Sequence, residues 1–370
     1  MHQECKVSII TVNYNGLKDT CSLIDTIPIE DSSIEVIVVD NASNTDEAGI
    51  LEKRYHKIKV IRSCRNLGFA GGNNLGIKAA KGKYLYLVNN DTEFKPFNIL
   101  PLIECMESSN DIGIVCPKIR FFWQPQPIQF AGYTPLSKIT MRNKCIGFGE
   151  QDKGQYNTAH PTPYAHGAAM LIKREAIEKV GMMPEDYFLY YEELDWSMMF
   201  RRAGYEIWYE PASEIFHKES STTGQNSPLR TYYITHNRLL FTKRNNTGIY
   251  KMLSYIYIIC VVATRDIIKH TIACRLDLTR ATFRGIAGLC PVAAFVERLP
   301  GKVEQNLHAV IFNINANVAL RSCFGQRMHP PNFAEFFINR FLRHRLNRVL
   351  GIKPTFINAH FVNHHARIFL

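Results

Sequence analysis

Two short apolar runs set the expected architecture: VSIITVNYN at residues 7–15 and IEVIVVDNAS at residues 34–43. Both are rich in β-branched residues and end in turn-forming polar residues, which is typical of buried strands. KVIRS at residues 59–63 and YLYLVNND at residues 84–91 repeat the pattern, with helical stretches between the runs. Apolar strands that alternate with helices predict an α/β fold with a doubly wound, mainly parallel sheet.

Polar side chains follow these strands at the points where the strands end. They are Asn13, Asp40, Asn66, Asn89, Asn90 and Asp91. In doubly wound sheets, ligands bind beyond the carboxyl ends of the strands. These positions therefore predict a ligand site at one edge of the sheet.

Asp91 gives the sharpest chemical signal, at the end of the NND sequence. A strand-end carboxylate can hold Mg²⁺ or Mn²⁺, because these hard cations prefer oxygen ligands and bridge to phosphate oxygens. A simple turn explains NND equally well on its own, since Asn and Asp favour turns. Asp40 has two similar interpretations: it accepts a hydrogen bond from a nucleobase or ribose, or it caps the segment that follows.

A glycine-rich segment, NLGFAGGNNLGIKAAKG at residues 66–82, follows the third strand. It does not place G-x-G-x-x-G directly after the first strand and lacks the P-loop GK[ST], so a nicotinamide enzyme and an ATPase lose support. Asn66, Asn73 and Asn74 offer amide donors near a strand end, and Arg65 faces either phosphate or solvent.

Three carboxylates, Glu192, Glu193 and Asp195, crowd the first turn of a predicted helix. Acids at this position complement the helix dipole, or one of them is a general base for a hydroxyl nucleophile. Like charges this close raise the pKa of at least one carboxyl group. His217 is a candidate metal or phosphate ligand, and His166 is similar, although a lone histidine is more often structural.

Taken together, the motifs resemble the family 2 glycosyltransferases, and most closely the branch similar to bacterial rhamnosyltransferases. The motifs, in chain order, are VSIITVNYN, VVDNAS, RNLGFAGGNN, YLVNND, AHGAAMLIKREA and YEELDWSMMFRRAGY, followed by His217. The resemblance covers about residues 5–245. It implies a GT-A fold, a Rossmann-like, mixed and mainly parallel sheet with helices on both faces, over residues 1–245.

The resemblance also implies the residues of the donor site. Thr11, Asn13 and Asp40 match positions that hold the nucleotide, Asp91 matches the metal-binding last acid of the D-x-D motif, and His217 completes the metal or diphosphate site. The nucleotide-sugar-binding residues expected from motif and resemblance together are Thr11, Asn13, Asp40, Arg65, Asn66, Asn73, Asn89 and Asn90. Asn89 stands where the family has a first carboxylate, so the expected Mg²⁺ or Mn²⁺ site carries less negative charge.

The same resemblance aligns Glu193 with the catalytic base, Glu192 with the preceding acid and Asp195 with the last acid of the helix start. Glu193 replaces the more usual aspartate, so the base remains open among the three. The expected reaction is inverting transfer of a sugar, with rhamnose as one candidate, from a nucleotide-diphosphate donor to a glycan or lipid-linked acceptor in cell-surface polysaccharide synthesis. Nucleotidyl transfer to a sugar phosphate is the alternative, and VNYNGLKD is a poor match to its triphosphate loop.

The formal net charge of +11 comes entirely from the last third of the chain, because residues 246–370 hold 16 basic and 5 acidic side chains. The neutral remainder argues against nucleic acid as a partner, and a basic nucleic-acid-binding module stays an alternative for the tail alone. MLSYIYIICVVAT at residues 252–264 is apolar, flanked by basic residues and short for a membrane span of about 20 residues. We expect residues 246–300 to form a mostly helical, membrane-associating region; residues 301–370 are basic and unassigned.

The expected location is the cytoplasm, peripheral on the cytoplasmic face of the membrane. The N-terminus lacks the pattern of a signal peptide. The 10 cysteines include no C-x-x-C pair, which favours a reducing compartment and no cysteine-based metal site.

Overall fold

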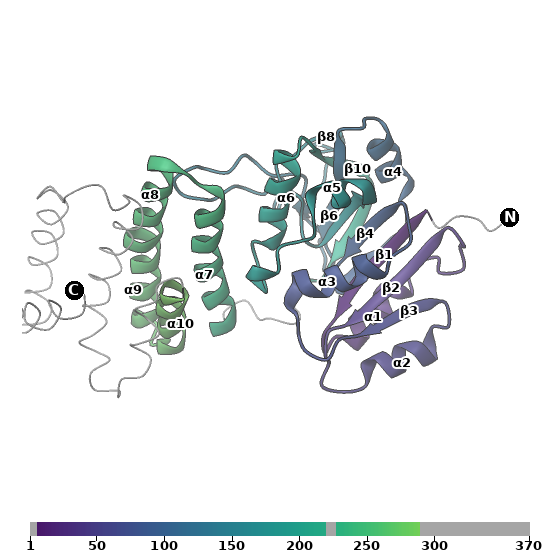
Figure 1. The fold of residues 1–370 in the computed structure, drawn as a ribbon, viewed down its shortest axis with the longest axis horizontal. Helices are drawn as coiled ribbons and strands as arrows, with labels where there is room; N and C mark the ends of the chain where they lie inside the picture. Colours follow the sequence, from purple (N-terminus) through teal and green to yellow (C-terminus); the bar gives the residue numbers. More distant parts are fainter. Residues whose placement is uncertain (1–5, 220–226, 289–370) are drawn as a thin grey trace, which may run out of the picture. The chain divides into compact units, whose positions relative to one another are not determined.

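A computed structural model describes residues 6–219 and 227–288 of the chain (Figure 1). The described residues all belong to one compact unit. The predictions for residues 289–300 and 301–370 lie outside the described residues.

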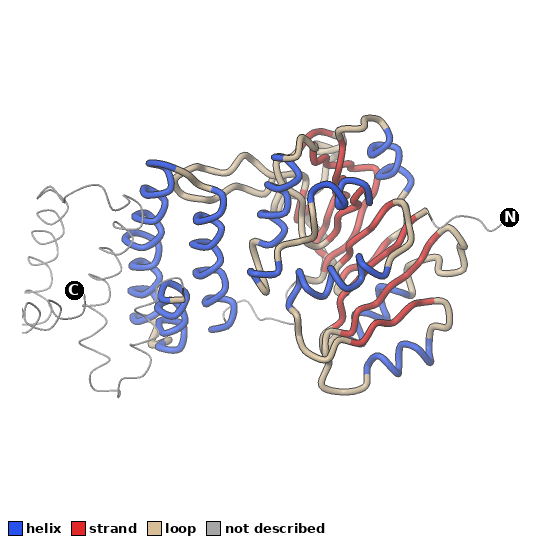
Figure 2. Tube along the Cα trace, in the orientation of Figure 1, coloured by secondary structure: helices blue, strands red, loops and turns tan. Residues whose placement is uncertain are grey.

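The N-terminal part of the structure is built on a mixed sheet, drawn red in Figure 2. Its strands lie in the order β3-β2-β1-β4-β9-β6-β10-β5. The strands are β1 (Val7–Asn13), β2 (Ile34–Asp40), β3 (Ile58–Arg62), β4 (Tyr84–Val88), β5 (Thr92–Phe94), β6 (Ile112–Phe121), β7 (Ile128–Phe130), β8 (His160–Pro161), β9 (Ala169–Lys173) and β10 (Glu206–His217). Strands β1 to β4 are parallel, and β9 lies antiparallel between β4 and β6. The predicted mainly parallel α/β sheet is confirmed.

Helices cover both faces of the sheet because alternate strand residues point to opposite sides. Val38 of β2 packs with Cys21 and Leu51 of the helices α1 and α2. A Cβ atom added at Gly76 of α3 would lie 2.3 Å from Ile10 and 3.4 Å from Val39, so α3 covers the other face. The helices of this part are α1 (Leu17–Ile24), α2 (Glu47–Arg54), α3 (Gly68–Ala79), α4 (Leu100–Glu107), α5 (Arg174–Val180) and α6 (Glu192–Arg202), with a 3-10 turn, η1 (Glu185–Tyr187).

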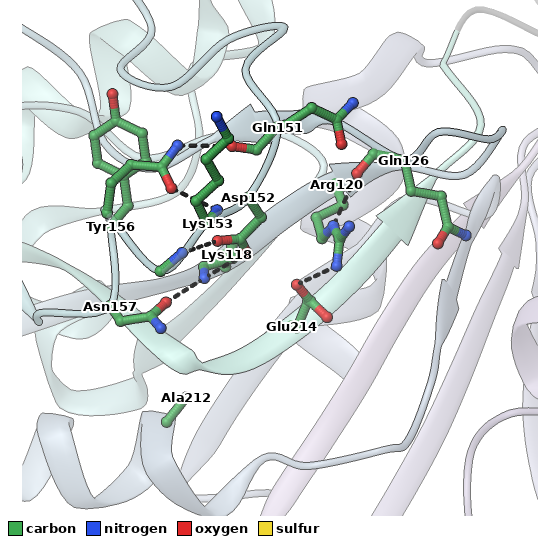
Figure 3. A network of polar contacts seen from close by, with 12 residues as sticks. Lys118, Arg120, Gln126, Gln151, Asp152, Lys153, Tyr156, Asn157, Ala212 and Glu214 are labelled. Carbon is green, nitrogen blue, oxygen red and sulfur yellow. Dashed lines mark hydrogen bonds and ion pairs between the residues drawn. The ribbon is translucent and has the colours of Figure 1, made fainter.

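The stretch at residues 120–165 has no clear hydrophobic period and consists of short strands and loops. Figure 3 shows how polar contacts fix one of these loops against β6. The buried Lys118 amino group lies 2.9 Å from Asp152 and donates to Asn157 Oδ1 at 2.6 Å. Arg120 lies 3.5 Å from Glu214 on β10. Because Lys118 is nearly fully buried, its pairing with Asp152 is needed to offset the cost of desolvation.

A group of helices follows the sheet. They are α7 (Pro228–Asn245), α8 (Gly248–Ile256), the π-helical η2 (Tyr257–Ala263), α9 (Thr264–Ile272) and α10 (Leu276–Ala287). The bounds of α8, η2 and α9 are contiguous, so they form a single long helix. Among the described residues, no helix is both long and apolar enough to cross a membrane.

Candidate active site

Asn13 holds two carboxylates together at the carboxyl ends of β1 and β2. Its register partner on β2 is Asp40, and its Nδ2 donates to Asp40 Oδ1 at 2.9 Å and to Glu47 Oε2 at 2.8 Å. Asn13 is fully buried, and its Oδ1 accepts a hydrogen bond from Thr20. Asn13 therefore orients Asp40, whose Oδ2 accepts only a long bond of 3.4 Å, from the backbone of Ser43, among the described residues.

The other predicted nucleotide residues differ in how their side chains are used. Thr11 is buried with an unpartnered hydroxyl among the described residues, and Arg65 is exposed. Asn66 Oδ1 accepts from Gly68 N at 2.9 Å and from Asn41 Nδ2 at 3.0 Å. Asn66 and Asn41 thus hold the loop before α3.

Asn73, also in the predicted set, is buried and donates to the backbone oxygen of Phe69 in its own helix at 2.9 Å. Asn90 connects the NND sequence to the Asn13 cluster. Its Nδ2 donates to Thr20 Oγ1 at 3.1 Å, and Thr20 in turn donates to Asn13. Asn89 N donates to Ala168 O at 2.9 Å. These contacts bring the ends of β1 and β4 and the start of β9 into one cluster.

Asp91, which directly follows Asn90, lies close to His217 at the end of β10. His217 Nε2 lies 3.1 Å from Asp91 Oδ1, yet it makes no hydrogen bond among the described residues. His217 Nδ1 is 2.8 Å from Gln129 Oε1. Because a carbonyl oxygen only accepts, Nδ1 carries a proton, and Nε2 is the ring nitrogen that faces Asp91. Both residues are more than nine-tenths buried.

His166 connects this pair to the helix α6. Its ring lies 6.5 Å from the ring of His217 and stacks on Tyr133 at 6.1 Å. Burial and the neighbouring His217 lower the pKa of His166 to about 3, so the ring is neutral. The next residue, Gly167, faces Glu193: a Cβ atom added at Gly167 would lie 3.8 Å from Glu193 Cγ.

Glu192 and Glu193 differ in their exposure at the start of α6. Glu192 is 3% exposed, and its Oε2 has no hydrogen-bond partner among the described residues. Burial and the adjacent Glu193 raise the pKa of Glu192 well above its ordinary value, so it favours the neutral form. Glu193 is partly exposed, and burial raises its pKa as well. Glu193 is therefore the more accessible of two carboxyl groups with raised pKa values.

Asp195, the third acid at this helix start, is bound to α7. It is 1% exposed, its Oδ2 lies 2.6 Å from Arg244 Nε, and its Oδ1 accepts from Asn245 at 2.7 Å. Tyr187 OH also donates to Asp195 Oδ2 at 3.0 Å. With all these partners, its carboxylate anchors α6 to α7.

The loop before α6 has an unusual backbone. Phe188, Tyr190 and Tyr191 have φ values of 58°, 70° and 78°, in a region that large side chains rarely adopt. Asn237 of α7, fully buried, donates through Nδ2 to the carbonyl oxygens of Tyr187, Leu189 and Tyr190, at 2.7, 2.7 and 2.9 Å.

On the other side of this loop, Gly68 has φ +71°, and an added Cβ would lie 2.1 Å from the oxygen of Phe188. A residue with a side chain does not fit there, which explains the glycine at the start of α3. The geometry that presents Glu193 therefore depends on both α3 and α7.

Residues 8–181 match the model of a family described as "Glycosyl transferase family 2". These residues form a family 2 glycosyltransferase domain. The matched residues contain Asp40, Asp91 and His166. Glu193 and His217 lie beyond the match, and the structure places His217 beside Asp91 and Glu193 beside Gly167.

Curated relatives of this chain carry the names of hexosyl- and rhamnosyltransferases. It is 28% identical over 239 residues to the "Low-salt glycan biosynthesis hexosyltransferase Agl10" of Haloferax volcanii, covering 63% of this chain and 74% of that one. It is 23% identical over 212 residues to the "N-acetylglucosaminyl-diphospho-decaprenol L-rhamnosyltransferase" of Mycobacterium tuberculosis, covering 52% and 69%. It is 24% identical over 300 residues to the "dTDP-rhamnosyl transferase RfbF" of Shigella flexneri, covering 76% and 95%.

Among solved structures, a "Crystal structure of GalNAc-T7 with UDP, GalNAc and Mn2+" matches this glycosyltransferase at 16% identity, with a TM-score of 0.49. The match covers 65% of this chain and 51% of that one, so the chain spans about half the length of that structure.

Proposed function

We propose that this glycosyltransferase moves a sugar from a nucleotide-diphosphate donor to an acceptor hydroxyl by a single displacement that inverts the anomeric carbon. The observation that carries the proposal is the series of neighbours from Asp91 through His217 to His166, whose next residue, Gly167, faces Glu193. A group for the leaving diphosphate and a group for the acceptor proton then lie at one end of the sheet. Inverting displacement needs both, one on each side of the reacting carbon.

Glu193 is the proposed general base. Its partial exposure lets an acceptor hydroxyl approach, and its raised pKa brings its basicity closer to working pH. The environments of its neighbours favour other roles. Glu192 is too deeply buried to meet a substrate, and Asp195 is occupied by α7.

Asp91 and His217 are the proposed ligands of Mg²⁺ or Mn²⁺. Two ligand atoms that take neighbouring positions around an octahedral cation at about 2.1 Å are about 3.0 Å apart, and their observed separation is 3.1 Å. His217 Nε2 also makes no hydrogen bond among the described residues, so a bound metal would displace no partner from it. A cation bound there would offset the charge that develops on the departing nucleoside diphosphate.

The described residues contain no group of three or more acidic, histidine or cysteine side chains that could hold a metal. The proposed site therefore relies on diphosphate oxygens to complete the coordination, which is common for Mg²⁺. Asn89 at the first position of the motif lowers the charge further, so the metal is expected to bind well only together with the donor.

The names of the relatives suggest the substrates. Two of them are rhamnosyltransferases by name, and the acceptor in one name is a sugar linked through a diphosphate to a lipid. We therefore propose rhamnose as the first donor sugar to test and a lipid-diphosphate-linked glycan of cell-surface polysaccharide synthesis as the acceptor class.

The helix 248–272 supports a peripheral contact with an anionic membrane. Its exposed apolar residues recur at helical spacing before, within and after the π-helical segment η2. They are Ile249, Ile256, Val261, Ile268 and Ile272. The basic residues Arg265 and Lys269 are exposed on the same helix. An apolar face bordered by basic side chains suits the surface of an anionic bilayer. Flotation of the full chain with anionic and neutral liposomes at low salt tests this, and equal flotation with both argues against it.

The main experiment measures transfer from a panel of nucleotide sugars with Mg²⁺ or Mn²⁺, and the anomeric configuration of the product. Glu193→Gln should lower kcat by about 10²-fold or more, and Asp91→Ala should abolish the metal dependence. Glu178→Gln, an exposed substitution on α5, is the matched control. Full turnover in both site variants would remove the assignment, and a retained anomeric configuration would remove the single displacement.

A further inference from the structure

Arg238 on α7 is a buried guanidinium without a carboxylate partner among the described residues. It is 4% exposed, and its Nη2 donates to the backbone oxygen of Thr140. Its Nε has no partner in the described part of the chain, and its charged group lies 5.9 Å from the ring centre of Tyr257. A buried charge is costly unless it is paired, so an unpaired nitrogen at such a site points to a missing anion.

Arg142 adds a second unpaired positive charge. It is two residues from Thr140, is exposed, and forms no ion pair within residues 6–219 and 227–288. Burial lowers the pKa of Arg238, and the nearby charges of Arg142 and Arg265 lower it further. Arg265 is already paired with Asp266 at 2.6 Å. Arg142 and Arg238 are therefore the two guanidinium groups of this region without a carboxylate partner among the described residues.

These two arginines lie beside the segment that presents the proposed base. Burial raises the pKa of the Tyr191 hydroxyl. The positive charges of Arg238 and Arg142 act against this rise, and the negative charge of Glu193 adds to it. Tyr191 directly precedes α6, and Asn237, the neighbour of Arg238, holds the loop before it. The positive pair is thus close to where an acceptor hydroxyl would be deprotonated.

We propose that Arg142 and Arg238 form a binding site for the diphosphate of a lipid-linked acceptor. Two guanidinium groups match the several oxygens of a diphosphate, because each can donate two parallel hydrogen bonds. The lipid chain would follow the helix 248–272, which carries Tyr257 beside Arg238 and the exposed apolar side chains. The assignment to the acceptor rests on the proposed function, whereas the binding of a diphosphate does not.

The test is calorimetric binding of inorganic pyrophosphate, farnesyl diphosphate and UDP to the full chain in EDTA, without donor sugar or turnover. Arg142→Ala should weaken binding of pyrophosphate and farnesyl diphosphate about tenfold or more. Arg238→Lys keeps the charge but not the planar fork, and should weaken it less. Lys144→Ala removes a positive charge from the same exposed loop and is the matched control, expected to bind like the wild type.

Three results would overturn the proposal. The first is wild-type affinity for pyrophosphate and farnesyl diphosphate in both arginine variants, and the second is an equal loss of affinity in Lys144→Ala. The third is a loss of affinity for UDP, without one for farnesyl diphosphate, in the arginine variants, which would assign the pair to the donor. Because no donor sugar or metal is present, failure of the chain to transfer any sugar would leave the binding result standing.

Discussion

Arg244 Nε, on α7, lies 2.6 Å from Oδ2 of Asp195, on α6, and this ion pair joins the helix of the proposed base to the helices that follow the sheet. Asp195 is 1% exposed, whereas the Arg244 side chain is 37% exposed. Arg244→Ala should therefore leave a buried carboxylate with fewer partners and lower the free energy of unfolding by about 1–3 kcal/mol. Urea denaturation measures this.

Arg54→Ala is the control for that experiment, because Arg54 pairs with Asp25 where both side chains are about half exposed. Its effect should stay within about 1 kcal/mol. If the two variants lose the same stability, the contact between Arg244 and Asp195 is no stronger than a surface ion pair.

Asn237 is predicted to be a positioning residue for Glu193. Asn237→Ala removes the hydrogen bonds to Tyr187, Leu189 and Tyr190, so the strained loop before α6 should relax. We expect kcat to fall with little change in the KM for the donor, because Asn237 contacts none of the residues proposed to bind the nucleotide. The acid limb of the kcat profile against pH should also move, since the surroundings of Glu193 change. A stability loss with an unchanged profile would mean that Asn237 is structural only.

Glu193 should set the acid limb of the reaction. A general base acts in its ionised form, so activity is lost as pH falls through its pKa. Burial raises the pKa of Glu193, and we expect the limb of kcat/KM above the ordinary glutamate value of about 4.3. Circular dichroism over the same pH range checks that the protein stays folded. A limb at or below about 4.3 would contradict the raised pKa.

Glu192 should make folding stability fall as pH rises. Its pKa is raised in the folded chain, so above the unfolded value of about 4.3 the folded state binds more protons than the unfolded state. Stability then decreases by up to about 1.4 kcal/mol per pH unit until the folded pKa is reached. Glu192→Gln lacks this loss, so its advantage over the wild type should grow as pH rises above the unfolded value of about 4.3. Denaturation series at several pH values measure it, and the exposed Glu178→Gln should show no such trend.

The sheet could be predicted from sequence because each parallel strand is a short apolar run that ends in a polar residue. The same pattern placed Asp40 and Asp91 at one edge, since parallel strands end on the same side. The strand β9 could also be recognised, but its antiparallel position between β4 and β6 depends on contacts far apart in sequence.

The partners of the site residues were harder to predict. Glu47 follows the helix cap Asp46 and looks like an ordinary acid in a first turn, yet it binds Asn13. Gln129 lies in a stretch without a clear period, and nothing local connects it to His217 across 88 residues. The role of Asp195 depends on α7, whose sequence carries no motif that points to α6. Local patterns give the position of a side chain, and long-range packing decides what it binds.

Gln129 should control metal affinity through His217. Its Oε1 accepts from His217 Nδ1 at 2.8 Å and so orients the ring with Nε2 toward Asp91. Removal of an outer hydrogen-bond partner of this kind typically lowers metal affinity by about 10–100-fold. Gln129→Ala should therefore weaken Mn²⁺ binding in the presence of UDP, measured by electron paramagnetic resonance, whereas Gln129→Glu keeps an acceptor oxygen and should restore it. The exposed Gln151→Ala serves as the control. Equal Mn²⁺ affinity in Gln129→Ala and the wild type would mean that His217 binds no metal or needs no partner to orient it.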